Sequence, residues 1–166
     1  GGAALDVTIQ GNYVGTDVTG SLDRGNASSG IVFDQFIVGP SRGLVGGTAA
    51  GAGNLVSGNQ ASGISLGRVT ESITVQGNFV GTDRTGSQAI ANSQFGIAVS
   101  GVPNVNHLIG GTVAGAGNLI SGNALGGVSL DSGGGHQVTG NRIGTDITGA
   151  LPLGNGWQWA HSEGGV

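Results

Sequence analysis

VTIQGNYVGTDVTG at residues 7–20 returns as ITVQGNFVGTDRTG at 73–86 and as HQVTGNRIGTDITG at 136–149. A second motif lies between these copies, since LVGGTAAGAGNLVSGN at 44–59 returns as LIGGTVAGAGNLISGN at 108–123. Four short segments follow the motifs and begin at residues 30, 63, 96 and 127: GIVF, GISL, GIAV and GVSL. The chain is therefore an array of two alternating units with a period of about 32 residues.

The composition of the units makes them strands and turns rather than helices. Glycine supplies 38 of the 166 residues, and the apolar residues between the glycines are mostly Val and Ile. A glycine inside a helix costs about 1 kcal/mol relative to alanine, so no segment sustains a helix. Short β-branched runs between Gly, Asn, Asp and Ser corners are typical of strands and turns. Strands that recur once per unit, without hairpins or crossover helices, predict an all-β fold: one parallel β-helix of about five turns.

Superposing the units by their period predicts which side chains stack from turn to turn. Three apolar columns are expected to face the core: Val14/Val45/Val80/Ile109/Ile143, Ile31/Ile64/Ile97/Val128 and Phe33/Leu66/Val99/Leu130. A glycine column follows the first of these, with positive φ or close backbone contact expected at Gly15, Gly46, Gly81, Gly110 and Gly144. An asparagine ladder, in which each amide bonds the next, is expected at Asn26, Asn59, Asn92, Asn123 and Asn155.

The aspartates of the GTD motif form a further column. Asp17, Asp83 and Asp146 occupy one position in alternate units, and Thr48 and Thr112 are expected to fill the turns between them as part of the same ladder. At about 4.8 Å per turn, successive carboxylates would lie about 9.6 Å apart, close to the separation used by inverting glycosidases. Their periodic placement favours a structural role instead, in which each Asp bonds N–H groups of its own turn. Calcium at Asp83 and Asp146 is a weaker alternative, since one Asp in two turns offers few ligands.

The motifs GNxIGTDxTG, IGGTxAGAGNxISGN and GIxL resemble the right-handed parallel β-helix repeats of the pectin-lyase-like superfamily, which is common among bacterial secreted and surface proteins. The resemblance covers about residues 5–158 and implies a right-handed solenoid. We expect a single β-helix domain over 1–166, with an irregular tail or the start of a further turn at 159–166. The superfamily includes polysaccharide lyases, glycosidases, tailspikes and adhesins, so the resemblance leaves the function open.

The regularity of the chain favours a non-catalytic structural or binding module, because no polar residue breaks the pattern to form a unique site. The alternative is a polysaccharide lyase or glycosidase, with the three GTD aspartates as its catalytic candidates. Ice binding is a minor alternative based on the recurring threonines, Thr16/Thr82/Thr145 and Thr19/Thr85/Thr148. No cofactor is expected apart from the calcium alternative.

Trp157 and Trp159 stand where the repeat pattern lapses, and alternate residues of a strand share one face. That face could stack on a sugar ring. Packing over an open end of the solenoid, or against a neighbouring subunit, is the favoured role because repeat arrays need capping.

The charge and cysteine content exclude several classes. A net charge of −4 provides no basic surface for nucleic acid, and no apolar run is long enough to predict membrane insertion. The absence of cysteine excludes disulfides and thiolate metal sites. With no Met and no Lys either, the composition favours an extracellular or cell-surface protein. The partners expected are further turns of a parent chain or end-to-end stacked copies, since Gly165-Val166 resembles the start of another GIxL strand, and a polysaccharide is a further candidate.

Overall fold

The computed structural model describes residues 5–34, 41–67, 72–101, 105–131 and 134–156. Within these ranges the chain forms strands and turns but no helix, and so no helix that could cross a membrane. The strands are β1 (Leu5–Ile9), β2 (Tyr13–Val14), β3 (Ile31–Phe33), β4 (Ser41–Gly46), β5 (Leu55–Val56), β6 (Ile64–Leu66), β7 (Ile73–Gln76), β8 (Phe79–Val80), β9 (Phe95–Val99), β10 (Leu108–Gly110), β11 (Leu119–Ile120), β12 (Gly126–Leu130), β13 (Gln137–Thr139) and β14 (Arg142–Ile143).

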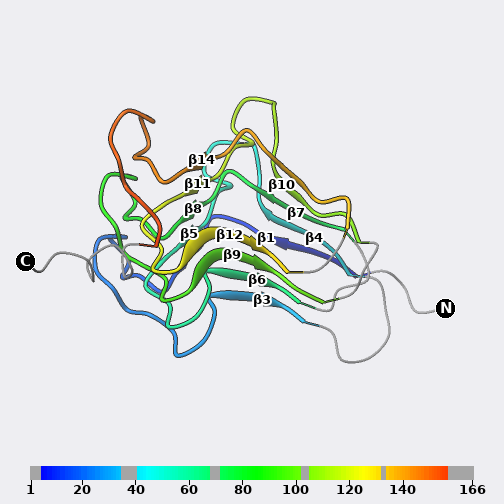
Figure 1. Cartoon of the computed structure of the whole chain (residues 1–166), viewed down its shortest axis with the longest axis horizontal. Helices are drawn as coiled ribbons and strands as arrows, with labels where there is room; N and C mark the ends of the chain where they lie inside the picture. The colour runs from blue at the N-terminus through cyan, green and yellow to red at the C-terminus, as the bar shows by residue number, and fades with distance from the viewer. Residues whose placement is uncertain (1–4, 35–40, 68–71, 102–104, 132–133, 157–166) are drawn as a thin grey trace, which may run out of the picture.

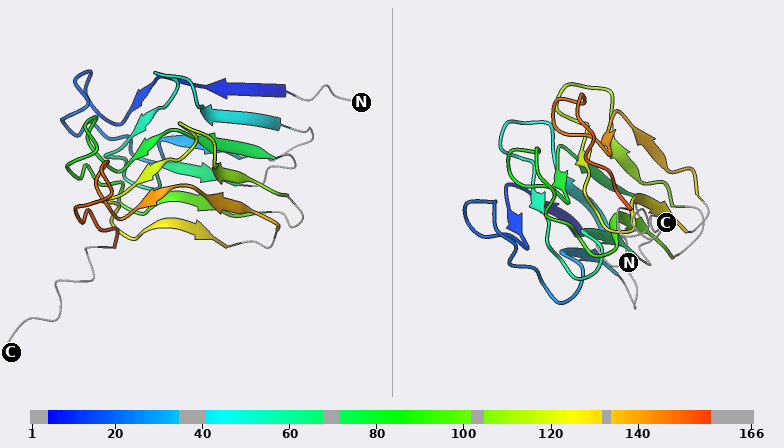
Figure 2. Two further views of the ribbon diagram at one scale, coloured as in Figure 1. Left: turned by 90° about the horizontal axis from the view of Figure 1, so that it is seen from above. Right: turned by 60° about the vertical axis from the view of Figure 1, so that its left-hand side comes forward.

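The strands build three parallel sheets, because every third strand along the chain joins the same sheet (Figure 1). Sheet A has the order β1-β4-β7-β10-β13, sheet B has β2-β5-β8-β11-β14, and sheet C has β3-β6-β9-β12. Each of the first four turns contributes one strand to each sheet, and the turns stack along one axis (Figure 2). The fold is therefore the parallel β-solenoid predicted from the repeats.

The solenoid has about four complete turns and a partial fifth, against the five turns predicted. Its paired residues Ile31, Ile64 and Ile97 are separated by 33 positions, which agrees with the period of the sequence. The fifth turn contributes β13 and β14 to sheets A and B, but within the described residues it adds no strand to sheet C.

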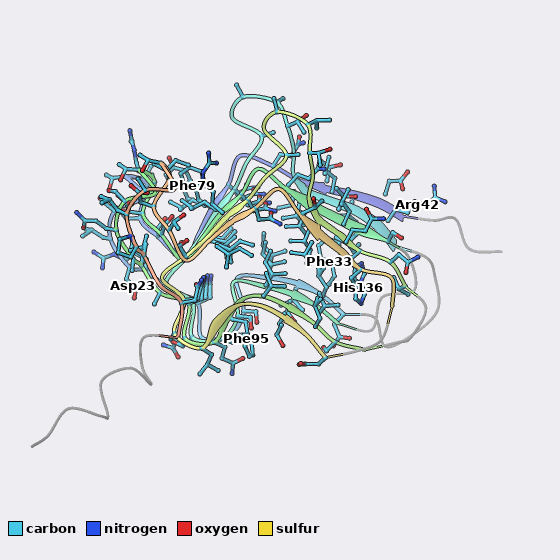
Figure 3. The ribbon with its side chains drawn as sticks, turned by 45° about the horizontal axis from the view of Figure 1, so that its top comes forward. Asp23, Phe33, Arg42, Phe79, Phe95 and His136 are labelled. Carbon is cyan, nitrogen blue, oxygen red and sulfur yellow. The ribbon has the colours of Figure 1, made fainter. Side chains whose placement is uncertain are left out.

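Apolar side chains from all three sheets fill the interior, where Figure 3 shows Phe33 between the sheets. Two predicted columns are confirmed in register in sheet C: Ile31/Ile64/Ile97/Val128 and Phe33/Leu66/Val99/Leu130. Most of these side chains are buried, but Leu130 is 46% exposed because no turn covers it in the described part of the chain.

The first predicted column is wrong, because it merges residues of two sheets. Sheet B stacks Val14, Val56, Val80, Ile120 and Ile143. Sheet A stacks Ile9, Val45, Val75, Ile109 and Val138. The glycine column divides in the same way, since Gly46 and Gly110 end strands of sheet A, whereas Gly15, Gly81 and Gly144 follow strands of sheet B. All five glycines have a positive φ, between 81° and 92°, as expected.

The two columns were merged because the two units carry their long loops at different corners. The first, third and fifth turns, here called GTD turns, have a loop after sheet B at residues 16–24, 82–90 and 145–153, the GTD loops. The second and fourth turns, the AGAGN turns, have a loop before sheet B at residues 47–53 and 111–117, the AGAGN arcs. The short strands of sheet B therefore lie between two groups of loops (Figure 1).

Candidate functional site

Each GTD aspartate is hydrogen-bonded within its own loop. Oδ1 of Asp83 accepts from the N–H groups of Ser87 and Gln88 at 3.0 and 3.1 Å, and Oδ2 accepts from the Thr85 hydroxyl at 2.5 Å. The other two loops repeat this arrangement: Asp17 accepts from Thr19, Ser21 and Leu22, and Asp146 from Thr148, Ala150 and Leu151. These are the bonds that the structural interpretation of the GTD motif predicts.

The same bonds lower the pKa of all three carboxyl groups. At Asp17 and Asp146 the largest cause is the threonine hydroxyl, and the backbone N–H groups of the loop add to it against the opposing effect of burial. At Asp83 burial raises the pKa, but the Thr85 hydroxyl and the loop N–H groups together outweigh it. The three side chains are therefore carboxylates at neutral pH, a state that cannot serve as a general acid.

The predicted alternation of Asp and Thr in one column is wrong. Thr48 and Thr112 lie in the AGAGN arcs that follow sheet A, whereas the aspartates lie in the GTD loops that follow sheet B. Successive GTD loops contact one another directly, because the Arg84 N–H donates to Gly20 O at 2.9 Å. No threonine ladder therefore separates the carboxylates.

The calcium alternative gains no further ligands from the structure. In the described ranges, no three His, Cys, Asp or Glu side chains are grouped closely enough to hold a metal ion. The carboxylates of Asp83 and Asp146 already accept hydrogen bonds from their own loops.

The predicted asparagine ladder is confirmed at the corner between sheets B and C. Nδ2 of each member donates to Oδ1 of the next at 2.8 to 3.0 Å, in the order Asn26, Asn59, Asn92, Asn123, Asn155. Each inner Nδ2 also donates to a carbonyl of the preceding turn, as Asn92 does to Val56 O at 3.0 Å. Asn59, Asn92 and Asn123 are fully buried, so these bonds satisfy polar groups that have no access to water.

A second asparagine ladder, at the corner between sheets A and B, was missed from the sequence. It runs through Asn12, Asn54, Asn78, Asn118 and Asn141, with Nδ2-to-Oδ1 distances of 2.8 to 3.0 Å. The signal was present, because an Asn precedes each sheet B strand by one position: NYV, NLV, NFV, NLI and NRI. Alignment of the units on their glycines hid it, because that alignment superposes residues of sheet A on residues of sheet B.

His107 lies directly before β10, at the start of sheet A. Its Nδ1 accepts from the Ile73 N–H at 3.1 Å, and its own N–H donates to His136 Nδ1 at 3.2 Å. The two imidazole rings stack with their centroids 5.0 Å apart (Figure 3 labels His136). Burial first, and then the neighbouring His136, lower the pKa of His107 to about 4. Nε2 of His136 is buried without a hydrogen-bond partner among the described residues.

The outer face of sheet B carries a groove of about 360 Å³ between an AGAGN arc and a GTD loop. Tyr13, Phe79 and Arg84 line it together with backbone of the arc, and its lining includes no Asp or Glu of the described residues. Leu55, which lies between the two aromatic residues in register, is almost fully buried because Gly20 lies against it. The groove therefore offers aromatic and guanidinium surface but no converging acids.

The tryptophans and the recurring threonines are the other residues that the sequence singled out. Trp157 and Trp159 lie outside the described residues. The threonines behind the ice-binding alternative are engaged within the GTD loops: Thr85 donates to Asp83, and Thr82 is buried and donates to Asp83 O.

Comparison with known proteins gives no relative, since the chain matches no family model, no curated protein and no solved structure. Membership of the pectin-lyase-like superfamily and the right-handed sense of the solenoid therefore stay predictions from the repeat motifs.

Proposed function

We propose that this chain is a non-catalytic structural or binding module of an extracellular or cell-surface protein. The observation that carries the proposal is the state of the GTD aspartates, whose oxygens are occupied by donors of their own loops. The same arrangement recurs in three turns, as expected of a structural element and not of a single catalytic centre. Membership of the pectin-lyase-like superfamily is the finer part of this proposal.

The competing proposal is a polysaccharide lyase or glycosidase. The groove over sheet B favours it, since Tyr13 and Phe79 offer ring surface of the kind that packs on sugars. Its weakness is the lack of acids among the residues that line the groove and the lowered pKa of the three GTD aspartates, which disfavours them as the proton donor that glycoside hydrolysis needs.

An activity screen on acidic and neutral polysaccharides, with and without calcium, separates the two. We expect no turnover by the intact chain or by Asp83→Asn. Ser87→Ala is the matched control, because it changes the same loop and leaves the carboxylate in place. Turnover by the intact chain that Asp83→Asn abolishes and Ser87→Ala retains would overturn the structural proposal.

A further inference from the structure

The described solenoid has a GTD turn at each end. At its C-terminal face, the last members of the apolar columns are partly exposed. Val138 is 38% exposed, whereas Val75 in the same column is fully buried, and Ile143 is 45% exposed. A β-carbon on Gly81 would lie 2.4 Å from Asn123 Oδ1 in the next turn, but one on Gly144 would meet nothing within 4 Å. The fifth turn therefore has the shape of an inner turn whose outer side is not covered by any of the described residues.

The asparagine ladders give the two faces opposite hydrogen-bonding character. At the C-terminal face, Nδ2 of Asn141 and Asn155 donates to Ile109 O and Ile120 O, and the ladder bond to a next turn is unmade among the described residues. At the N-terminal face, Oδ1 of Asn12 and Asn26 accepts no bond from the described residues. One face thus presents amide donors and the other presents amide acceptors.

The bonds between neighbouring turns within the described solenoid identify which type of turn fits each end face. The Gly11 and Gly77 N–H groups donate to carbonyls of AGAGN arcs, Ala52 O at 3.1 Å and Ala116 O at 3.2 Å. Gly140 is the equivalent residue of the fifth turn, and its N–H has no acceptor in the described part of the chain. An AGAGN arc would supply that acceptor at the C-terminal face.

A serine supplies the matching evidence at the N-terminal face. Oγ of Ser57, in an AGAGN turn, accepts from the Gly81 N–H at 3.0 Å and donates to Thr82 O at 2.7 Å. Ser121 repeats both bonds with the fifth turn. The equivalent groups of the first turn, the Gly15 N–H and Thr16 O, lack a serine partner among the described residues. GTD turns carry glycine where AGAGN turns carry this serine, so only an AGAGN turn can supply the hydroxyl.

The thickness of the GTD loops prevents a further GTD turn from stacking on either end face of the solenoid. GTD loops two turns apart are already in hydrogen-bond contact, Arg84 N–H to Gly20 O and Ile147 N–H to Gly86 O, both at 2.9 Å. Each loop therefore fills the height of two turns, about 9.6 Å, and two GTD loops at the spacing of one turn, about 4.8 Å, would overlap.

We propose that each end face is a docking surface for a β-solenoid turn of the AGAGN type. A second copy of residues 5–156 does not qualify, because each of its ends presents a GTD turn. The inference deepens the proposed structural role and rests on it, but its test uses stability and not activity, so the two can fail separately.

Two extended chains test the C-terminal face. In the first, residues 93–131 follow Asn155 in place of 156–166, which adds an AGAGN turn in register. In the second, residues 124–155 follow Asn155, which adds a GTD turn. We expect the first extension to raise Tm by about 5 °C or more and to slow amide exchange at Gly140 by about tenfold or more, and the second to do neither. Equal or greater stabilisation by the GTD extension would overturn the proposal.

Two internal deletions keep the proposal testable if the extended chains do not fold. Deletion of 27–59 joins Asn26 to Gln60 and places two GTD turns together, whereas deletion of 27–92 joins Asn26 to Ser93 and keeps the alternation. We expect the larger deletion to give the more stable protein by urea unfolding. If the smaller deletion is as stable or more so, GTD turns can stack directly and the proposal fails.

Discussion

At the scale of single residues, the contribution of a ladder asparagine to stability depends on how many hydrogen bonds its side chain makes. Asn92 accepts from the N–H and Nδ2 of Asn59 and donates to Asn123 Oδ1 and Val56 O. Asn26, at the exposed end of the same ladder, donates to Asn59 Oδ1. The same residue type therefore carries different energetic weight according to its place in the ladder.

Replacing Asn92 by alanine should cost about 3 kcal/mol or more of unfolding free energy, because buried donors and acceptors in two neighbouring turns lose their partners. Asn26→Ala is the matched control and should cost under about 1 kcal/mol, since water reaches that end. Urea unfolding of both variants measures the difference. Equal losses of unfolding free energy in the two variants would contradict the prediction that an inner member of the ladder stabilises the fold more than its end member.

The sequence predicted the asparagine ladder at the corner between sheets B and C because its members recur with the period of the repeat. Four of them lie four residues before a GIxL segment, and Asn155 follows Asn123 by 32 residues. It did not predict the His107–His136 pair. Histidine does not recur with the period of the repeat, so no column in the sequence indicates this pair. The pairing of β10 with β7 places His107 beside Ile73.

At the scale of elements, the strands of sheet A explain why the first predicted apolar column was wrong. The dipeptides Val14-Gly15 and Val45-Gly46 look equivalent, but the first ends β2 in sheet B and the second ends β4 in sheet A. Alignment on the shared Val-Gly dipeptide does not separate them, because the long loop precedes sheet B in one type of turn and follows it in the other. The Asn that precedes each strand of sheet B does separate them, since Asn12 lies two positions before Val14 and Gly43 lies two positions before Val45.

His107, at the start of sheet A, should make stability depend on pH. The pKa of His107 is about 4 in the folded chain, against an ordinary value of 6.5. The unfolded state therefore binds a proton first, so the free energy of unfolding should fall as pH drops from about 6.5 to about 4, by at most about 3 kcal/mol, and not change further from this group below that.

Urea unfolding at about pH 7, 5.5 and 4 measures this dependence. His107→Asn is the control, because an amide Oδ1 can accept from the Ile73 N–H but does not titrate. The variant should lose most of the slope in this range. An unchanged slope would assign the pH dependence to another group.

At the scale of the whole molecule, most contacts of a turn are with the turns beside it, and the GTD loops add contacts two turns away, so stability is approximately a sum of local interfaces. Amide exchange should therefore be slowest in β7 and β8, in the third turn, and fastest in β13 and β14, whose outer side is uncovered among the described residues. Hydrogen exchange followed by mass spectrometry measures the gradient. Uniform protection across all turns would show that the solenoid unfolds as one cooperative unit.

The asparagine ladders also give the molecule an electrical direction. In both ladders Oδ1 of each inner amide accepts from the preceding turn and one Nδ2–H donates to Oδ1 of the next turn, so the amides share one direction and their dipoles add along the axis, as peptide dipoles add in an α-helix. The strands contribute little, because the N–H and C=O groups of a sheet alternate in direction. By the direction of these amide dipoles alone, the C-terminal face is the positive end of the ladders and the N-terminal face is their negative end.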